Sequence, residues 1–350
     1  MSSAPDLVAA SAYGSTAPST RVRLLDWLAH LGLSALRMEY AGLANNSTRT
    51  ILRAPLAVAA AEWRTRGRTA AERVDGRSLV LSREASPFSR GAVEERLLTR
   101  AAWGVYDLDD ALFADTAGWR RVLGKDEKCR RAMSAADMVV VGNDYLASYA
   151  ADHATRVTVI PSCVEPDDYT PKTDYSVEDR PEIVWLGSGS TEQYVVEIAP
   201  ALREVQRRTG ARLTLISSAR TEERPELDGL VTRVPWRASE VAARLAAADV
   251  AIAPLRDDEY ARGKCAYKVL QYAAAGLPIV ASPVGANALA IERFDAWSAV
   301  DHADWVSQVE DALSMSAARR EARGQHARSA VAEHYSFAAW ADEWRKAVGL

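Results

Sequence analysis

Short apolar strand patterns alternate with helical patterns along almost the whole chain, and this alternation constrains the fold more than any other feature. Each strand pattern is bounded by turn residues and followed by a helix-length segment, as in βαβ units with a parallel sheet. Six strands are expected in each half of the chain, at residues 6–11, 34–38, 78–82, 103–107, 138–141 and 157–161, and at residues 182–187, 212–217, 231–235, 249–254, 277–282 and 298–300. The expected helices are residues 21–31, 48–66, 92–100, 125–135, 145–153, 194–209, 239–247, 267–275 and 304–325.

A segment rich in Pro and Asp, without periodicity, separates the two halves and is expected to be a linker. With 350 residues, the chain is long enough for two domains. We therefore expect an α/β protein with two Rossmann-like, doubly wound domains. Residues 1–163 form the first, 164–181 the linker and 182–328 the second. Residues 329–350 are expected to form one C-terminal helix, which can cross back to the N-terminal domain. Its packing face would carry Tyr335, Phe337, Trp340 and Trp344.

The composition excludes several classes of protein. The apolar fraction is 48% and the charged fraction is 26%, which rules out a disordered chain, a fibre and a membrane protein. The net charge of −4 does not favour a polyanion such as DNA as a partner. Residues 269–291 are uncharged but contain Pro and Gly, so they indicate a helix, a turn and a strand rather than a membrane span. The three cysteines, Cys129, Cys163 and Cys265, are far apart and are expected to be reduced thiols of a cytoplasmic protein.

Motifs of nucleophilic, zinc or P-loop chemistry are absent from the sequence. None of the five histidines lies in a nucleophile motif, and the turn AYGST after the first strand lacks the GxGxxG pattern of dinucleotide sites. The turn GSGS at residues 187–190 does follow an expected strand and precede a helix. Glycines in such a turn allow backbone N–H groups to approach a phosphate.

Two pairs of lysines stand out in a chain whose basic residues are mostly arginine. Lys125 and Lys128 lie in the charged run GKDEKCRR, which indicates a solvated face. Lys264 and Lys268 lie four residues apart at the expected start of an apolar helix, a spacing that would place both on one face. Two ammonium groups beside a buried segment need an anionic partner, and a diphosphate is a suitable one.

The segment that contains the second pair resembles the nucleotide-sugar site of family-4 glycosyltransferases, which have the GT-B fold. Their pattern K-x-x-E-Y-x-A-x-G-x-P-V-V-A corresponds here to KVLQYAAAGLPIVA. The segments PSTRVRLLDWLAHLG, VYDLDDALF, ADMVVVGNDYLASYA, VTVIPSCVEP and IVWLGSGSTEQYV resemble other parts of that family, in the same order. The resemblance covers nearly the whole chain and implies two domains that face each other across a cleft, the first binding the acceptor and the second the donor.

The resemblance assigns roles to particular residues. The family has two glutamates eight residues apart that contact the donor sugar and the ribose; here these positions are Gly263 and Gln271, and Asp257, Asp258 or Glu259 would replace the missing acid. The implied catalytic residues are Lys264, Lys268 and Glu259. The implied donor-binding residues are Gly14, Ser15, Gly187, Ser188, Trp236, Lys264, Lys268 and Gln271, with the lysines on the diphosphate and Trp236 framing the base. The implied acceptor-binding residues are Arg21, Asp109 and Asp110.

The aspartates of VYDLDDALF also permit a metal interpretation, since Asp pairs hold Mn²⁺ or Mg²⁺ in other glycosyltransferases. Asp107, Asp109 and Asp110 follow a strand, however, where Asp is common in turns and caps. The family resemblance implies no metal and no cofactor, because basic residues neutralise the leaving diphosphate and the nucleotide sugar is a substrate.

The family resemblance implies a retaining glycosyltransferase that moves a sugar from a nucleoside diphosphate, UDP in particular, to a hydroxyl. A bacterial secondary metabolite or surface glycan is the expected acceptor, a small molecule or glycan rather than nucleic acid, and no integral membrane segment is expected. Two alternatives remain open. One is a nucleotide-sugar epimerase of the same fold, and the other is a degenerate, non-catalytic partner that regulates an active transferase.

Overall fold

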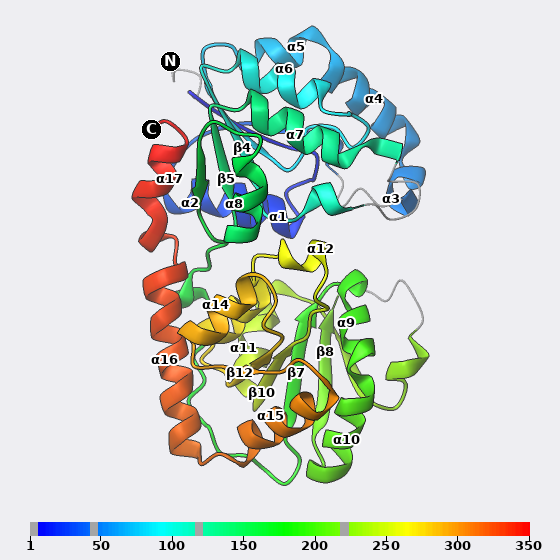
Figure 1. The fold of residues 1–350 in the computed structure, drawn as a ribbon, viewed down its shortest axis with the longest axis vertical. Helices are drawn as coiled ribbons and strands as arrows, with labels where there is room; N and C mark the ends of the chain where they lie inside the picture. Colours follow the sequence, from blue (N-terminus) through cyan, green and yellow to red (C-terminus); the bar gives the residue numbers. More distant parts are fainter. Residues whose placement is uncertain (1–5, 43–47, 116–121, 218–223) are drawn as a thin grey trace. The chain divides into compact units, whose positions relative to one another are not determined.

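The computed structural model describes residues 6–42, 48–115, 122–217 and 224–350, and its chain forms two compact α/β units (Figure 1). The first unit comprises residues 1–162, 262–265 and 340–350, and the second comprises residues 163–261 and 266–339. Each of the twelve strands expected from the sequence has a counterpart in the structure, six in each unit. The prediction of two doubly wound α/β sheets is therefore confirmed.

The first unit contains a six-stranded parallel sheet in the order β2-β1-β3-β4-β5-β6. The strand order reverses between β1 and β3, which makes the carboxyl ends of these two strands a topological switch point, where open α/β sheets bind ligands. Its strands are β1 (Leu7–Ser11), β2 (Leu36–Glu39), β3 (Ser78–Ser82), β4 (Trp103–Leu108), β5 (Met138–Val141) and β6 (Val157–Val159). Its α-helices are α1 (Pro18–Thr20), α2 (Asp26–His30), α3 (Thr48–Arg53), α4 (Pro55–Arg66), α5 (Arg68–Glu72), α6 (Ala92–Arg100), α7 (Lys125–Ala135), α8 (Asp144–Ala151) and α17 (Ala341–Ala347).

The second unit contains another six-stranded parallel sheet, in the order β12-β11-β10-β7-β8-β9. Its switch point lies between β7 and β10. Its strands are β7 (Glu182–Gly187), β8 (Arg212–Ser217), β9 (Val231–Pro235), β10 (Val250–Ala253), β11 (Ile279–Ala281) and β12 (Trp297–Ser298). Its α-helices are α9 (Gln193–Glu197), α10 (Ala199–Thr209), α11 (Ala238–Ala247), α13 (Tyr267–Ala274), α14 (Ala286–Arg293), α15 (His302–Ser314) and α16 (Ala317–Tyr335), and α12 (Glu259–Arg262) spans the boundary with the first unit.

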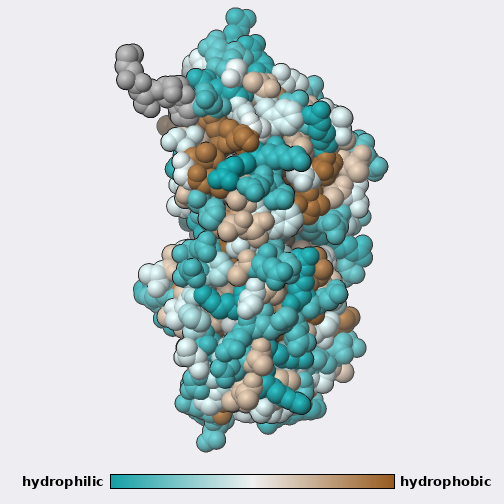
Figure 2. Space-filling model, turned by 90° about the vertical axis from the view of Figure 1, so that its left-hand side faces the viewer, coloured by the Kyte–Doolittle hydropathy of each residue, from teal (hydrophilic) through white to brown (hydrophobic). Residues whose placement is uncertain are grey.

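The second sheet is apolar on both faces because helices cover both. Val184 and Leu186 of β7 pack in one core with α11, α13 and α16, whereas Ile183 and Trp185 pack in another core with α10 and α15. Strands buried on both faces are typical of parallel sheets. Both faces are thereby closed to ligands, and the carboxyl ends of the strands are where such sheets bind them. On the face of the molecule along which α17 lies, hydrophobic residues form separate patches among hydrophilic ones (Figure 2).

Several helices expected to be continuous are broken at identifiable residues. The helix expected at 48–66 divides into α3 and α4 at Ala54, directly before Pro55. The helix expected at 194–209 divides into α9 and α10, and α10 begins with a Pro in its first turn. The helix expected at 304–325 is α15 followed by α16, because Met315 is extended, with φ −61° and ψ 142°. Propensity patterns alone did not indicate these breaks.

The expectation of a single helix over residues 329–350 is wrong. Helix α16 ends at Tyr335, and Ser336 is extended with φ −80° and ψ 157°. A 3-10 turn and α17 follow it. Within the first unit, the indole of Trp344 in α17 stacks on Trp27 in α2, with ring centroids 5.3 Å apart. Of the four aromatic residues expected on one helix face, Tyr335 ends α16, Phe337 lies in a turn, Trp340 ends the 3-10 turn and Trp344 lies in α17.

A close backbone contact joins α16 to the end of α13 in the second unit. A Cβ on Gly324 would lie 2.2 Å from the carbonyl oxygen of Gly276 and 2.4 Å from the hydroxyl oxygen of Tyr175. That hydroxyl also donates a hydrogen bond of 2.8 Å to the same carbonyl oxygen. Only glycine fits at position 324 without displacing backbone.

Gly324→Ala is accordingly expected to lower the free energy of unfolding by about 2 kcal/mol, because overpacking outweighs the better helix propensity of Ala. Ser329→Ala, at an exposed position of the same helix, serves as the control and should change it by less than about 0.5 kcal/mol. Urea denaturation of the two variants measures the difference. Equal stability of Gly324→Ala and the wild type would show that α16 is not packed this closely.

Candidate functional site

The switch point of the second unit brings Gly187, Trp185 and Lys268 together. A Cβ on Gly187 would lie 2.3 Å from the ring of Trp185 and 2.9 Å from Cε of Lys268. The ammonium group of Lys268 is held 5.3 Å from the centroid of the buried Trp185 ring. The absence of a side chain at position 187 thus leaves room for the lysine to reach the end of β7.

The turn after β7 carries polar groups beside this lysine. Ser188 caps a 3-10 turn at Gly189–Thr191, and the side chains of Ser188 and Thr191 cap each other's backbone. Lys268 Nζ lies 3.4 Å from Thr191 Oγ1. Ser188 and Ser190 are exposed. The first N–H groups of such a turn have no acceptor inside it, so together with the lysine they can bind an anion.

Gln271 of α13 is held by Tyr169, a residue to which the sequence analysis gives no role. Its amide Nε2 donates a 2.8 Å hydrogen bond to the hydroxyl of Tyr169, while its Oε1 accepts none from the described residues. The side chain is almost buried, with 9% of its surface exposed. The contact holds the amide in one orientation and leaves a neutral acceptor oxygen. Tyr169 lies in the segment predicted to be a linker, where no motif marks it.

Trp236 follows β9 and is 46% exposed, so its ring is not part of the core. Its backbone N–H donates to the carbonyl oxygen of Ser217 at the end of β8, at 2.8 Å. The neighbouring Glu192 is buried and accepts hydrogen bonds from the Ser217 hydroxyl at 2.6 Å and from Arg233 at 2.7 Å. This buried network positions the strand ends next to an aromatic ring that can stack on a planar base.

Lys264 and Lys268, the second pair of lysines noted in the sequence, belong to different units. Helix α13 begins at Tyr267, after Ala266 adopts a left-handed conformation with φ 53°. Lys264 precedes that break and lies in the first unit, where its Nζ is 3.5 Å from Asp110 Oδ1. Lys268 lies on the helix in the second unit. The expectation that both lie on one helix face is therefore wrong.

Position 263, where the resemblance places the first acidic residue, has no room for a side chain. A Cβ there would lie 2.5 Å from both the backbone nitrogen and the Cβ of Ala111. Glu259 lies in α12 and is exposed. The carboxylate of Asp258 caps the same helix by accepting a 2.7 Å hydrogen bond from the N–H of Ala261. Asp258 thus has a structural partner, whereas the Glu259 side chain extends into solvent.

The switch point of the first unit holds a buried charge network around Glu84. Its Oε2 accepts hydrogen bonds from Lys125 and, at 2.6 Å, from Lys128, and Lys128 also donates to the carbonyl oxygen of Ser86 at 2.6 Å. The Tyr13 hydroxyl lies 3.4 Å from Glu84 Oε1. Lys125 and Lys128 are 8% and 1% exposed, so the interpretation of this run as a solvated face is wrong.

Burial alone would raise the pKa of Glu84, but Lys128 and Lys125 outweigh it and lower this pKa to about 2. Burial lowers the pKa of Lys125 despite Glu84. The pKa of Lys128 is raised, because Glu84 and Glu94 outweigh its burial. The surroundings as a whole therefore favour the charged form of Lys128 and disfavour that of Lys125.

Asp109 and Asp110 are both held by Arg83. Its guanidinium donates to Asp109 at 2.5 and 3.0 Å and to Asp110 at 2.8 Å. Burial would raise the pKa of Asp109, but Arg83 lowers it. Arg83 itself has φ 62°, a left-handed conformation that is costly for a residue with a side chain. The strained residue thus orients both carboxylates at the end of β4.

The other binding residues expected in the first unit are Arg21, Gly14 and Ser15, and each has different neighbours. Arg21 forms an ion pair with Asp26 at 3.0 Å, with 41% of its side chain exposed. Arg23, two residues further along the chain, is buried and donates a hydrogen bond of 2.6 Å to Asp107. Gly14 is buried, and a Cβ there would lie 2.6 Å from the carbonyl oxygen of Gly42. Ser15, the next residue, is exposed.

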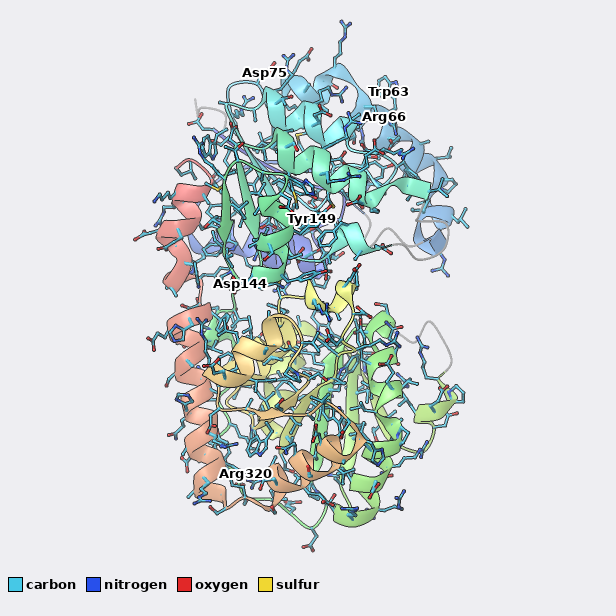
Figure 3. All side chains as sticks on the ribbon, viewed as in Figure 1. Trp63, Arg66, Asp75, Asp144, Tyr149 and Arg320 are labelled. Carbon is cyan, nitrogen blue, oxygen red and sulfur yellow. The ribbon has the colours of Figure 1, made fainter. Side chains whose placement is uncertain are left out.

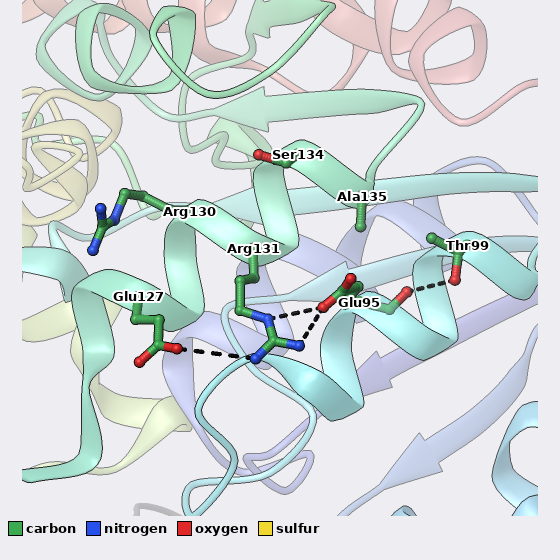
Figure 4. Close-up of a pocket in the computed structure, with 7 residues that line it drawn as sticks. All are labelled: Glu95, Thr99, Glu127, Arg130, Arg131, Ser134 and Ala135. Atoms are coloured by element: carbon green, nitrogen blue, oxygen red, sulfur yellow. Dashed lines mark hydrogen bonds and ion pairs between the residues drawn. The ribbon is translucent and has the colours of Figure 1, made fainter.

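A groove of about 640 Å³ lies between α6 and α7 of the first unit (Figure 4). Arg131 crosses it and forms ion pairs with Glu95 at 2.5 Å and with Glu127 at 4.0 Å. The charges inside it are therefore already paired. Its lining residues are Glu95, Thr99, Glu127, Arg130, Arg131, Ser134 and Ala135.

Cys129, Cys163 and Cys265 are buried free thiols, as the sequence predicts.

No described helix is both long enough and apolar enough to cross a bilayer.

Comparison with known proteins identifies relatives of the second unit. Residues 180–315 match the family described as glycosyl transferases group 1. This range contains the GSGS turn, Trp236, Lys268 and Gln271. No match to a curated protein was found.

Solved structures resemble the whole chain. Sucrose-phosphate synthase from Thermosynechococcus elongatus has a TM-score of 0.71 at 14% identity, with 97% of each chain covered. A UDP-forming α,α-trehalose-phosphate synthase from Burkholderia xenovorans has a TM-score of 0.69 at 14% identity, with 99% of each covered. WaaG, a glycosyltransferase involved in lipopolysaccharide biosynthesis, has a TM-score of 0.62 at 14% identity, with 95% of this chain and 98% of WaaG covered. These likenesses show the GT-B fold.

The low pKa of Glu84 predicts how stability depends on pH. A carboxylate whose pKa falls from 4.5 to about 2 on folding stabilises the protein above pH 4.5, and this contribution is lost as the pH falls towards 2. Glu84→Gln also leaves two buried lysines without their anion, so it should cost about 3–5 kcal/mol at pH 7. The stability difference between wild type and variant should shrink between pH 5 and pH 3, as measured by chemical denaturation.

Glu95→Gln provides a control, because its ion pair with Arg131 is partly exposed and contributes at most about 1 kcal/mol. A difference between wild type and Glu84→Gln that stays constant over this pH range would contradict the assignment of a low pKa to Glu84.

Proposed function

We propose, from the match of residues 180–315 to the group 1 glycosyl transferases, that this chain transfers a sugar from UDP to an acceptor hydroxyl with retention of anomeric configuration. The acceptor is proposed to be a bacterial secondary metabolite or a surface glycan, and the reaction to take place in the cytoplasm. The observation that carries the proposal is the position of Lys268 beside the glycine turn at the β7/β10 switch point.

The donor binds, in this proposal, to the carboxyl ends of β7 to β10. The diphosphate lies against the Gly187–Ser188 turn and the ammonium of Lys268, which is held by Trp185 and Thr191. Gln271 Oε1 accepts from a ribose hydroxyl, since Tyr169 occupies the amide nitrogen. Trp236 stacks on the uracil, and its exposure leaves the ring accessible for this contact.

The chemistry requires the protein to stabilise the leaving diphosphate and to hold the two substrates in a reactive geometry. Lys268 supplies positive charge where negative charge develops on the leaving oxygen. We assign Lys264 to the same task as a second cation, released from Asp110 when the donor binds. Glu259, exposed on α12, is the proposed carboxylate for the donor sugar in place of the residue excluded at position 263.

The acceptor is assigned to the first unit. Asp109 and Asp110, oriented by Arg83, present carboxylate oxygens that can accept hydrogen bonds from acceptor hydroxyls. Arg21 is partly exposed and can contribute a donor. The exposed Ser15 next to Gly14 is assigned to the donor phosphates.

A second candidate function is supported by one observation. A side chain at position 263 would collide with Ala111, so there is no space for the first of the two glutamates of the family. At the position of the second glutamate the chain has the neutral Gln271. A partner subunit that binds nucleotide sugars without turnover would have this pattern.

Incubation with a panel of nucleotide sugars and candidate acceptors, followed by NMR of the anomeric proton, separates the possibilities. Release of UDP with a product of retained configuration supports the transferase. An isomerised sugar nucleotide would indicate an epimerase, and tight binding without turnover a regulatory partner.

Lys268→Ala should raise the Kd for UDP at least about tenfold, because a charge-assisted contact contributes roughly 1.5–3 kcal/mol. Lys346→Ala removes an exposed lysine of the first unit and serves as the matched control, with no expected change. Isothermal titration calorimetry measures both. An unchanged Kd in a correctly folded Lys268→Ala protein would exclude Lys268 from the diphosphate site.

Tyr169→Phe tests the role of the fixed amide. Loss of one neutral hydrogen bond should let the Gln271 side chain rotate and raise the Kd for UDP about three- to tenfold. Dideoxy-UDP, which lacks both ribose hydroxyls, should bind wild type and variant equally. If the substitution weakens both nucleotides to the same extent, Gln271 does not contact the ribose.

A further inference from the structure

Helices α3 and α4 of the first unit carry an exposed apolar stripe, defined here as Leu52, Leu56 and Trp63 with the exposed Ala59 and Ala60 between them. The three large side chains are 72%, 85% and 79% exposed. Leu56 and Trp63 lie seven residues apart on α4 and therefore project from the same face of the helix. Large apolar side chains exposed on one helix face and on the adjoining helix indicate a surface that binds a partner.

The opposite face of α4 is firmly packed, so the exposure of the stripe does not result from a detached helix. Val58 and Ala61 are buried in a core cluster with Ala12 and Tyr40. The Tyr40 hydroxyl lies 3.3 Å from the carbonyl oxygen of Val58. Helix α4 is thus apolar on its inner face and on its exposed face.

The charges that flank the stripe are positive. Residues 53–68 contain four arginines and one glutamate, in a chain whose net charge is −4. All four arginines, Arg53, Arg64, Arg66 and Arg68, are exposed. One carboxylate oxygen of the glutamate, Glu62, accepts hydrogen bonds from Tyr40 at 2.8 Å and from Ser86 at 2.7 Å, and the other forms an ion pair with Arg66. Arg53, Arg64 and Arg68, all described in the structure, have no ion pair with this glutamate, so the segment keeps an excess of positive charge. Figure 3 labels Trp63 and Arg66 at the edge of the first unit on α4.

We propose that this face of α3 and α4 docks the protein onto an anionic membrane surface. Leucine and tryptophan side chains enter the boundary between headgroups and acyl chains, while flanking arginines bind lipid phosphates. A second copy of the chain is a poorer occupant, because a two-fold contact would bring four arginines against four others. The stripe shares no residue with the donor and acceptor residues proposed above.

Cosedimentation with lipid vesicles tests the proposal. The wild type should bind vesicles of phosphatidylcholine and phosphatidylglycerol and should not bind vesicles of phosphatidylcholine alone. The double variant Leu56→Ser/Trp63→Ser should lower the partition coefficient at least about tenfold. Arg53→Gln and Arg68→Gln should each lower it about fivefold, and added salt should weaken binding. Val300→Ser, at a position 73% exposed in the second unit, is the control and should bind like the wild type.

Three results would overturn the proposal. The first is a wild type that does not bind the anionic vesicles, and the second is a double variant that binds them as well as the wild type. The third is dimerisation in the absence of lipid that the double variant abolishes, which would assign the stripe to a second copy. Thermal unfolding of each variant verifies that the fold is intact.

Discussion

The burial of both faces of each parallel sheet is the constraint on which the rest of the structure depends. The strands are apolar on both sides, so helices must cover both faces. After each strand the chain must also return to the end of the sheet at which the strands begin. The carboxyl ends of the strands, with the loops that follow them, are then where polar side chains can meet a ligand. The residues at this end of the sheet are Lys268, Gln271 and Trp236 in the second unit. In the first unit they are Glu84, Asp109 and Asp110.

The polar groups at the carboxyl ends of the two sheets differ in kind. In the first unit Glu84 binds two lysines and Arg83 binds two aspartates, so this network supports the strand ends. In the second unit Lys268 lies against the ring of Trp185 and the hydroxyl of Thr191, where its positive charge can attract an anion. The glycine at position 187 makes this arrangement possible, since any side chain there would collide with Trp185.

Strand positions could be predicted from the sequence because alternation of apolar runs and turns is a local signal. The partners of charged residues could not, because they are distant in the chain. Lys128 lies 44 residues from Glu84 and Arg23 lies 84 residues from Asp107, and nothing in the run GKDEKCRR indicates a buried carboxylate. The start of α13 after Ala266 depends on a left-handed backbone conformation that propensity does not predict. Tyr169 was missed for the same reason, as its contact with Gln271 spans 102 residues.

The central claim of this account is that the donor nucleotide occupies the β7/β10 switch point of the second unit. Hydrogen–deuterium exchange of the full chain with and without saturating UDP tests it most directly. Slower exchange is predicted in the peptides that contain the Gly187–Thr191 turn, Trp236 and the start of α13, with little change at β11 and β12. Protection confined to the first unit, or none at saturating UDP, would contradict the claim.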